Sequence, residues 1–253
     1  MRSLILWIFS LGLLSSSWAT DLSAATENFR SGNQAYEKGE FTKAEQEYQK
    51  AISLGASDSR LYFNYGNTLF RLNRLGPAVL YYEKAFKISP DDEDIAFNLR
   101  YARATIVDKI PEPEPNLLTR ILWALHTAYS IRAGIWLSYA LYASAFGLAI
   151  ARLFLSGLLR TFALTMMILS LMGLVLVSPS LAYKIHQYES TEFCIVMQPM
   201  IEVYSGPGEN YQVLIKIHEG TKVEVVENQG EWLSVKLANG KGGFVRTQQL
   251  GKV

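Results

Sequence analysis

Two long uncharged stretches limit what this chain can fold into. Residues 133–151, AGIWLSYALYASAFGLAIA, and residues 161–183, TFALTMMILSLMGLVLVSPSLAY, contain no charged side chain. Each is long enough to cross a hydrocarbon core of about 30 Å as a helix. A backbone inside a membrane must satisfy its own hydrogen bonds, as a helix does. The sequence therefore predicts a hairpin of two transmembrane helices at these positions.

The connection between the two stretches indicates the orientation of the hairpin. It reads RLFLSGLLR over 152–160, with an arginine at each end and no acidic residue. Loops on the cytoplasmic side of a membrane are enriched in lysine and arginine near the ends of the spans. We therefore expect 152–160 to be a cytoplasmic loop. The regions before and after the hairpin then lie together on the opposite side.

The N-terminal residues support this orientation. A basic residue precedes an apolar stretch at 4–14, and the small residues Ser17 and Ala19 are spaced like a signal-peptidase site. The apolar stretch is shorter than the roughly 20 residues that a spanning helix needs. We interpret 1–19 as a cleaved signal peptide, and an uncleaved anchor or a buried helix is the alternative. Both flanking regions are then expected on the exported side of the membrane.

The two stretches predict no transport activity. A conducting or pumping site usually needs an ionisable residue at membrane depth, and neither stretch contains one. Ala143, Gly147 and Ala151 are small residues spaced by four, which allows a second helix to approach closely. This ridge of small residues could pack against the other helix of the hairpin or against a helix of a partner protein.

The region before the hairpin repeats itself with a period of 34. Laying GNQAYEKGEFTKAEQEYQKAISL over GNTLFRLNRLGPAVLYYEKAFKI pairs Gly32 with Gly66 and Tyr48 with Tyr82. This pattern of small and large residues resembles the tetratricopeptide repeat, whose period is 34. The resemblance predicts an all-α solenoid over 20–110. Its expected parts are repeats at about 25–58 and 59–92 and a capping helix at 92–109.

The same resemblance implies a groove that holds a peptide or a protein segment, lined by the first helix of each repeat. The candidate groove contacts are Asn33, Tyr36, Asn64, Asn67 and Arg71. The alternative is that the asparagines satisfy local backbone groups. Some relatives bind a C-terminal carboxylate with basic residues, at positions where this chain has Phe29, Asp94 and Asn98. Carboxylate capture is therefore not expected.

A segment rich in proline ends the solenoid. The stretch 111–116 alternates Pro and Glu, which holds the backbone extended and semi-rigid, so we expect a spacer there. In 117–131, leucine and isoleucine recur on one helical face, which is typical of a helix lying in the membrane interface. A core helix of the repeat domain is the alternative for 117–131.

After residue 190 the hydrophobic period changes to two, which is typical of β-strands separated by Gly- or Asn-containing turns. The order SGPG, GTKV, EWLSV and GKGGFV within 195–250 resembles bacterial SH3 domains. We therefore expect a small all-β SH3-like barrel over 190–253. The candidates for a ligand groove in it are Tyr204, Tyr211, Trp232 and Phe244. Trp232 and Phe244 suit a core position equally well.

Composition argues against several classes of function. Lys and Arg total 24 against 23 for Asp and Glu, and no region has the basic bias of a nucleic-acid-binding protein. A single cysteine, Cys194, cannot form an internal disulfide and is expected to be buried. The three histidines show no metal-ligand spacing. We find no nucleophile with a base, no paired carboxylates and no phosphate loop, so no enzyme activity, metal or cofactor is expected.

The order of modules in this multidomain membrane protein resembles that of one family along the whole chain. Signal peptide, repeats, spacer, interfacial helix, hairpin and SH3-like domain follow one another as in the E-type members of the Bat (Bacteroides aerotolerance operon) proteins. The resemblance implies a non-enzymatic inner-membrane adaptor or scaffold in an aerotolerance or envelope-stress complex. Its implied partners are von Willebrand A-domain Bat proteins and a MoxR-type ATPase. The alternative is a cell-wall-binding protein whose SH3-like domain docks on peptidoglycan while the repeats recruit a partner.

Overall fold

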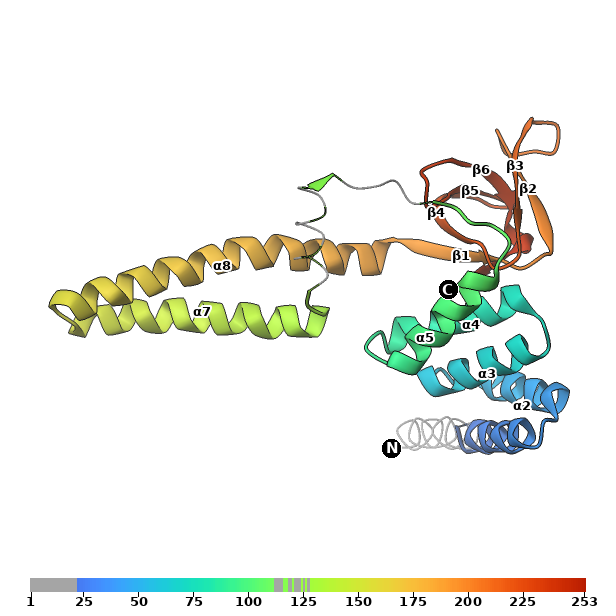
Figure 1. Cartoon of the computed structure of the whole chain (residues 1–253), viewed down its shortest axis with the longest axis horizontal. Helices are drawn as coiled ribbons and strands as arrows, with labels where there is room; N and C mark the ends of the chain where they lie inside the picture. The colour runs from blue at the N-terminus through green and yellow to red at the C-terminus, as the bar shows by residue number, and fades with distance from the viewer. Residues whose placement is uncertain (1–21, 112–115, 118–119, 121–123, 125, 127) are drawn as a thin grey trace, which may run out of the picture. The chain divides into compact units, whose positions relative to one another are not determined.

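The computed structural model describes residues 22–111, 116–117, 120, 124, 126 and 128–253. The chain divides into two compact units, one made of the segments up to Pro111 and Glu192–Val253, and the other of Glu112–Thr191 (Figure 1). The predicted signal peptide and most of the predicted spacer lie outside the described residues. The second unit is therefore an insertion between the two segments of the first unit.

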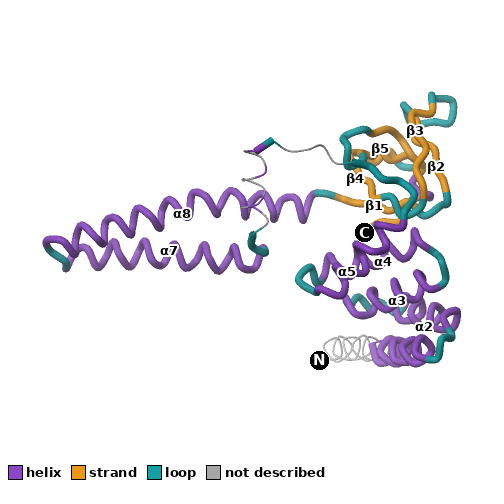
Figure 2. The backbone as a smooth tube through the Cα atoms, in the orientation of Figure 1, coloured by secondary structure: helices purple, strands orange, loops and turns teal. Residues whose placement is uncertain are grey.

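The N-terminal segment of the first unit is a run of short helices joined by tight turns (Figure 2). They are a helix at 22–37, α2 (Phe41–Ser53), α3 (Ser59–Arg71), α4 (Leu75–Ile88) and α5 (Glu93–Thr105). Asp58 caps α3 and Asp92 caps α5, because each side chain accepts two backbone N–H groups of the first turn. A cap of this kind stabilises a helix by about 1 kcal/mol.

Two glycines allow neighbouring helices to pack closely. A Cβ atom at Gly32 would lie 2.5 Å from Cε1 of Tyr48, and one at Gly66 would lie 2.8 Å from Cδ1 of Tyr82. Both tyrosines are buried. The two pairs are related by the period of 34, so the structure places the small and large residues of the repeat against each other, as the sequence indicates.

The C-terminal segment of the first unit is a seven-stranded antiparallel sheet in the order β3-β2-β6-β5-β4-β1-β7. Its strands are β1 (Glu192–Val196), β2 (Met200–Tyr204), β3 (Val213–His218), β4 (Lys222–Gln229), β5 (Trp232–Lys236), β6 (Gly242–Arg246) and β7 (Leu250–Lys252). Side chains alternate along β2, where Ile201 and Val203 are buried and join a core with Ile217, Val223 and Val245. Cys194 is buried in the same core, as expected.

The helices and the sheet share buried side chains. Ile195 of β1 is fully buried in the same core as Val79 and Leu80 of α4. Met197 and Val253 pack against that core from the sheet side. The two regions, which the sequence presents as separate modules, therefore form one packed unit.

The second unit contains two apolar helices, α7 (Ile131–Phe154) and α8 (Gly157–Ser190). Both are long and apolar enough to cross a membrane, with a mean hydropathy of 1.5 for α7 and 2.2 for Gly157–His186. The predicted spans 133–151 and 161–183 lie within them. The described residues between 117 and 127, a part of the expected interfacial helix, are helical.

The connection between α7 and α8 is shorter than the loop expected at 152–160. α7 continues to Phe154 and α8 begins at Gly157, so only Leu155 and Ser156 lie outside the helices. Gly157 has a φ of +59°, in the left-handed region that favours glycine. Leucine and arginine are good helix formers, so the two flanking arginines continue the helices instead of ending them.

Candidate functional site

Four asparagines form two equivalent pairs between the first helices of neighbouring repeats. Asn33 Oδ1 accepts hydrogen bonds from Tyr48 Oη at 2.8 Å and from Asn64 Nδ2 at 2.9 Å. One period further along, Asn67 Oδ1 accepts from Tyr82 Oη at 2.7 Å and from Asn98 Nδ2 at 2.9 Å. We call Asn33, Asn64, Asn67 and Asn98 the asparagine row.

The two tyrosines that donate hydrogen bonds to the asparagine row stay protonated. Burial is the main cause that raises the pKa of Tyr48 and of Tyr82 well above the ordinary value of 10.0. Each hydroxyl therefore fixes one oxygen of the row at any ordinary pH. The alternative from the sequence was that the asparagines satisfy local backbone groups. In the structure the asparagine oxygens instead accept hydrogen bonds from side chains.

Each asparagine of the row is half-buried and has one amide group left over. Nδ2 of Asn33 and Asn67 and Oδ1 of Asn64 and Asn98 form no hydrogen bond to any other described residue. A half-buried polar group without a partner is available to a ligand, and its desolvation is costly if the ligand leaves it unpaired. The row therefore offers a bound molecule the Nδ2 groups of Asn33 and Asn67, and the Oδ1 atom and second N–H of Asn64 and of Asn98.

Aromatic side chains lie near the row on α3 and α5, and those on α5 are exposed. The rings of Phe70 and Tyr101 lie 5.7 Å apart, and Phe97 is one turn before Tyr101 on the same side of α5. Phe97 is 60% exposed and Tyr101 57%. We call these three residues the aromatic edge. Large apolar side chains that are exposed beside polar ones are typical of interaction surfaces.

The other two predicted groove residues, Tyr36 and Arg71, both contact Phe41, the first residue of α2. The Arg71 guanidinium lies over the Phe41 ring at 4.6 Å, and the Tyr36 ring is 5.3 Å from that ring. The structure thus brings Asn33 together with Asn64, and Tyr36 together with Arg71 through Phe41. The sequence analysis did not propose Asn98, Phe97 or Tyr101 as contacts. Asn98 could have been found from the sequence, because the spacing of 31 between Asn33 and Asn64 recurs between Asn67 and Asn98.

The positions of the carboxylate clamp carry no positive charge. Phe29 packs against Tyr48 with ring centroids 6.1 Å apart, Asp94 is exposed in the first turn of α5, and Asn98 belongs to the asparagine row. A free carboxylate placed here would lose its hydration without gaining a cation in return.

The predicted aromatic residues of the sheet are distributed over two contacts. The Tyr204 and Trp232 rings meet edge to face at 5.6 Å, and the Arg246 guanidinium lies 5.2 Å from the Trp232 ring. Tyr211 covers Gly206, where a Cβ atom would lie 2.5 Å from its ring. Phe244 is opposite Tyr204 in the ladder between β2 and β6. Tyr204, Trp232 and Arg246 therefore form one cluster, while Tyr211 shapes the turn that follows β2.

A buried carboxylate connects the helices to the sheet. Glu83 of α4 is 3% exposed. It accepts hydrogen bonds from Arg103 of α5 and, at 2.9 Å, from Lys222 Nζ of β4. Glu219 Oε2 also accepts the backbone N–H of Gly76 at 3.1 Å. These ion pairs and hydrogen bonds join three elements across the helix–sheet contact.

Asp108, which follows α5, makes a second connection to the sheet. It accepts hydrogen bonds from the backbone N–H of His218 at 2.6 Å, from His218 Nδ1 at 2.8 Å and from Thr221 Oγ1 at 2.6 Å. Burial acts to raise the pKa of Asp108, but the donors Thr221 and His218 outweigh it and hold the pKa below its ordinary value of 3.8.

We expect the free energy of unfolding of the first unit to decrease in acid as Asp108 becomes protonated. The folded-state pKa is lower than the unfolded value of 3.8, so the folded state binds fewer protons. The contribution of Asp108 is therefore present above pH 3.8 and is lost as the pH falls through the folded value. Urea unfolding of the Asp108→Asn variant between pH 2.5 and 6 should show a weaker pH dependence than the unaltered chain. Identical slopes would contradict the prediction.

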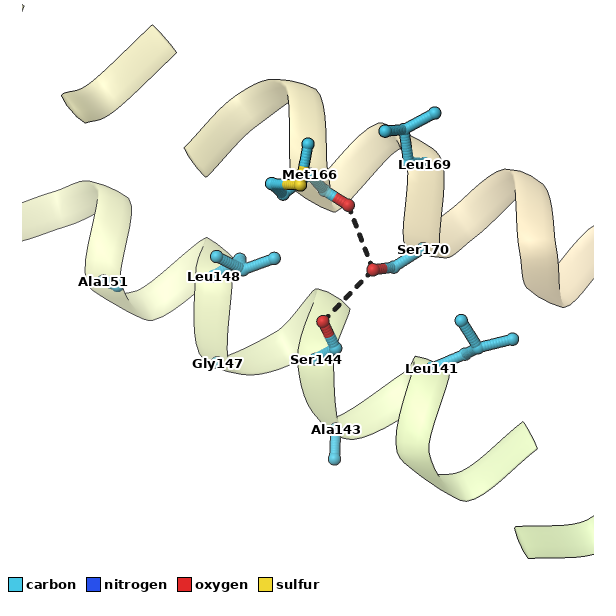
Figure 3. A pocket seen from close by; sticks show the side chains of 9 residues that line it. All are labelled: Leu141, Ala143, Ser144, Gly147, Leu148, Ala151, Met166, Leu169 and Ser170. Atoms are coloured by element: carbon cyan, nitrogen blue, oxygen red, sulfur yellow. Dashed lines mark hydrogen bonds between the residues drawn. The ribbon is translucent and has the colours of Figure 1, made fainter. Parts of the chain in front are cut away.

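The hairpin carries an apolar hollow of about 690 Å³, shown in Figure 3. The small-residue ridge, Ala143, Gly147 and Ala151, lines it together with Leu148 and residues of α8. Ser144 Oγ and Ser170 Oγ lie 3.1 Å apart and hydrogen-bond across the two helices. The lining residues are apolar or small, and none of them is charged.

Comparisons with known proteins identify two domains. A model of the bacterial SH3 domain matches residues 201–250, and a model of the tetratricopeptide repeat matches residues 59–92. No curated protein matches the chain.

Two solved structures are similar to the helical region. The TPR domain of Arabidopsis OM64 is 24% identical with a TM-score of 0.32, over 33% of this chain and 69% of that chain. The first TPR of Spaghetti (RPAP3), bound to the HSP90 peptide SRMEEVD, is 17% identical with a TM-score of 0.25, over 33% of this chain and 93% of that chain. The family models and the fold together show that this chain combines a tetratricopeptide repeat with a bacterial SH3 domain and two helices apolar enough to span a membrane.

Proposed function

We propose that this protein is a non-enzymatic inner-membrane adaptor whose repeats and SH3 domain bind protein partners in the periplasm. The observation that carries the proposal is the asparagine row beside the aromatic edge. The row has amide groups without partners among the described residues, and the edge exposes two large aromatic side chains. When a protein segment covers such a surface, the exposed aromatic rings are removed from water and the free amide groups gain new partners.

The packing of the first unit supports a common side for both domains. The chain leaves this unit after Pro111, passes through the hairpin and returns at Glu192. Ile195 and Lys222, from after the hairpin, contact α4, from before it. Two segments that share a core lie on one side of a membrane, and a hairpin of two spans meets this requirement.

The order of modules supports a proposal for the partners. That order resembles the E-type Bat proteins, so we propose that the partners are von Willebrand A-domain Bat proteins and, through them, a MoxR-type ATPase. The adaptor then contributes binding surfaces and not chemistry, and it acts in aerotolerance or envelope stress without a cofactor.

Site-specific crosslinking in cells tests the adaptor function. A photo-crosslinking amino acid at Tyr101, on the aromatic edge, is expected to capture a membrane-anchored von Willebrand A-domain protein. The matched control is the same amino acid at Val226, which is 62% exposed on the sheet. Adducts that are the same at both positions, or absent at both, would contradict the proposal.

Cysteine labelling tests the orientation. In a Cys194→Ala background, a cysteine in place of Ala238 in the turn after β5 should react with a membrane-impermeant thiol reagent on spheroplasts. A cysteine in place of Ser156, between α7 and α8, should react only after lysis. Both parent residues are exposed, and burial raises the pKa of the native Cys194 thiol, which makes it a poor nucleophile. The reverse pattern would place the binding domains in the cytoplasm.

The cluster of Tyr204, Trp232 and Arg246 favours a second candidate function, binding of peptidoglycan by the SH3 domain. An edge-to-face aromatic pair beside a cation offers stacking and hydrogen bonding to a sugar or peptide. The full chain in detergent would then sediment with purified cell walls, and Arg246→Ala would reduce the bound fraction several-fold. An adaptor that binds only proteins stays in the supernatant.

A further inference from the structure

A group of polar side chains joins α8 to the residues just before α7. Tyr129 Oη donates a hydrogen bond to Ser180 Oγ at 2.7 Å, and His126 Nδ1 lies 2.8 Å from the same oxygen. Lys184, one turn after Ser180, donates a hydrogen bond from Nζ to the carbonyl oxygen of Tyr129. Its ammonium also lies 4.0 Å from the centre of the Tyr129 ring. We call Tyr129, Ser180 and Lys184 the lysine site.

Lys184 is a cation without a carboxylate partner among the residues that the structure describes. Its side chain is half-buried, and the ammonium uses one of its three N–H groups on the Tyr129 carbonyl. The stretch 116–188 contains no Asp or Glu in the sequence, although it contains four arginines and this lysine. A cation that is partly removed from water is costly unless it is paired. The lysine site therefore favours an anion supplied from outside the chain.

An apolar groove begins beside the lysine site. α7 and α8 lie side by side (Figure 2), and between them is a groove of about 340 Å³. Its lining residues come from both helices and carry no charge: Ile135, Ser138, Tyr139, Tyr142, Leu174 and Leu181. Leu181 is one turn before Lys184. A Cβ atom at Gly134 would lie 2.7 Å from the Tyr129 ring and 3.1 Å from Leu181, so this glycine lets the tyrosine of the site and the first leucine of the groove approach closely.

The groove runs along the helices, away from the lysine site. It extends from Ile135 to Tyr142 on α7 and from Leu181 to Leu174 on α8, which is about 10 Å at 1.5 Å per residue. Ser138 Oγ donates a hydrogen bond to the carbonyl oxygen of Gly134, so its hydroxyl is satisfied within α7. An anion bound at Lys184 and an apolar chain in the groove would therefore be continuous with each other.

An anionic phospholipid has both parts in this order. Lys184 lies near the end of the apolar segment Gly157–His186, where the headgroups lie if this segment spans a bilayer. Arg132, in the first turn of α7, is exposed and adds positive charge to the same end of the hairpin. A zwitterionic headgroup would bring its own cation to this end, so a headgroup with a net negative charge is favoured.

We propose that the lysine site binds the headgroup phosphate of an anionic phospholipid, and that one acyl chain of the same lipid lies in the groove between α7 and α8. This inference goes beyond the proposed function. It requires that the hairpin lies in a membrane, and it holds whether or not the first unit binds proteins. It assigns to the hairpin a specific lipid ligand in addition to its part as an anchor.

Native mass spectrometry of the full chain in a non-ionic detergent tests the proposal, because it counts the lipid molecules that stay bound. The probes are dioleoyl phosphatidylglycerol, dioleoyl phosphatidylcholine, which has the same chains, and glycerol 3-phosphate, which has no chains. We expect the first lipid to bind at least about fivefold more tightly than the second. Glycerol 3-phosphate in tenfold molar excess should displace neither lipid.

Variants of Lys184 test the headgroup contact. Lys184→Gln removes the charge and should weaken phosphatidylglycerol at least about fivefold, while Lys184→Arg keeps the charge and should retain binding. The matched control is Arg160→Gln, which removes an exposed cation of α8 at the other end of the hairpin and should change binding less than twofold.

Variants of Ser138 test the groove. Ser138→Leu fills the groove without changing any charge and should weaken both lipids. Ser138→Ala, which removes the hydroxyl without filling the groove, is its control and should bind as the unaltered chain does. Size-exclusion chromatography shows whether each variant stays monodisperse. If one does not, the comparison of the two lipids on the unaltered chain still decides the question.

Equal binding of the two lipids, or unchanged binding after Lys184→Gln, would overturn the assignment of the headgroup site. Displacement of phosphatidylglycerol by glycerol 3-phosphate would show a site for a free phosphate ester and not for a lipid. Unchanged binding after Ser138→Leu would remove the acyl chain from the groove. None of these outcomes bears on protein binding by the first unit, which the crosslinking at Tyr101 tests separately.

Discussion

Replacing Glu83 with glutamine is expected to lower the free energy of unfolding of the first unit by about 2–3 kcal/mol. Glu83 is 3% exposed, and Arg103 and Lys222 each bind one of its oxygens. Removing one partner of a buried ion pair costs about 3–5 kcal/mol, because a charge is left without compensation. We expect the smaller loss of about 2–3 kcal/mol here, because the side chains of Arg103 and Lys222 are 43% and 31% exposed and can turn to water.

Pulse proteolysis of the full chain in detergent, over a series of urea concentrations, measures this effect on the first unit. The matched control is Glu27→Gln, since Glu27 and Arg30 lie 4.0 Å apart with side chains 69% and 71% exposed. An exposed pair of this kind contributes less than about 0.5 kcal/mol. If both variants unfold at the same urea concentration as the unaltered chain, Glu83 does not join the helices to the sheet as described.

Local periodicity accounts for the parts of the fold that were predictable. The period of 34 paired Gly32 with Gly66 and Tyr48 with Tyr82 as equivalent small and large positions, and the structure packs each of these glycines against the tyrosine of its own repeat. Charge-free length likewise indicated α7 and α8, because the hydrophobic requirement of a span is carried by consecutive residues. Patterns that involve residues close together in the chain can be recognised from one sequence alone.

The helix–sheet contact could not be predicted in the same way. Lys222 and Glu83 are 139 positions apart, and His218 and Asp108 are 110 apart. No periodic pattern connects residues at these distances, and lysine and glutamate are ordinary surface residues when they are considered alone. The contact depends on the sheet returning to α4 after the hairpin, which only the folded chain reveals.

The candidate site was predictable in part for a related reason. Asn33, Asn64 and Asn67 follow from their place on the first helix of each repeat. Phe97 and Tyr101 do not, because an aromatic residue on a helix is more often buried than exposed, and only the structure shows them at 60% and 57% exposure. The asparagine–tyrosine bonds also required coordinates, since Tyr48 looks like a plain core residue in the sequence.

The second large effect is expected when the sheet is removed. A chain that ends at Thr191 should lose the cooperative fold of α4 and α5. The loss includes the burial of Ile195, the packing of Met197 and Val253 against α4, and the hydrogen bonds to Glu83 and Asp108. The burial of Ile195 alone contributes about 1.5–3 kcal/mol, and the other contacts add to it, against the roughly 5–15 kcal/mol that stabilises a domain.

Hydrogen exchange of the α4 and α5 peptides should therefore rise by at least about a hundredfold in the truncated chain, as local opening costs less free energy. The full-length variant Ile195→Ala is the graded control and should lose about 2–5 kcal/mol, with exchange between the two extremes. Repeats of this kind bury apolar faces only against neighbours, and α5 is followed by no second helix of its own repeat in unit one. Unchanged protection of α4 after truncation would mean that the helices are complete without the sheet. A rise in exchange would mean that the SH3 domain serves as the end cap of the repeats, so that a partner held at Phe97 and Tyr101 rests on a helix that the sheet stabilises.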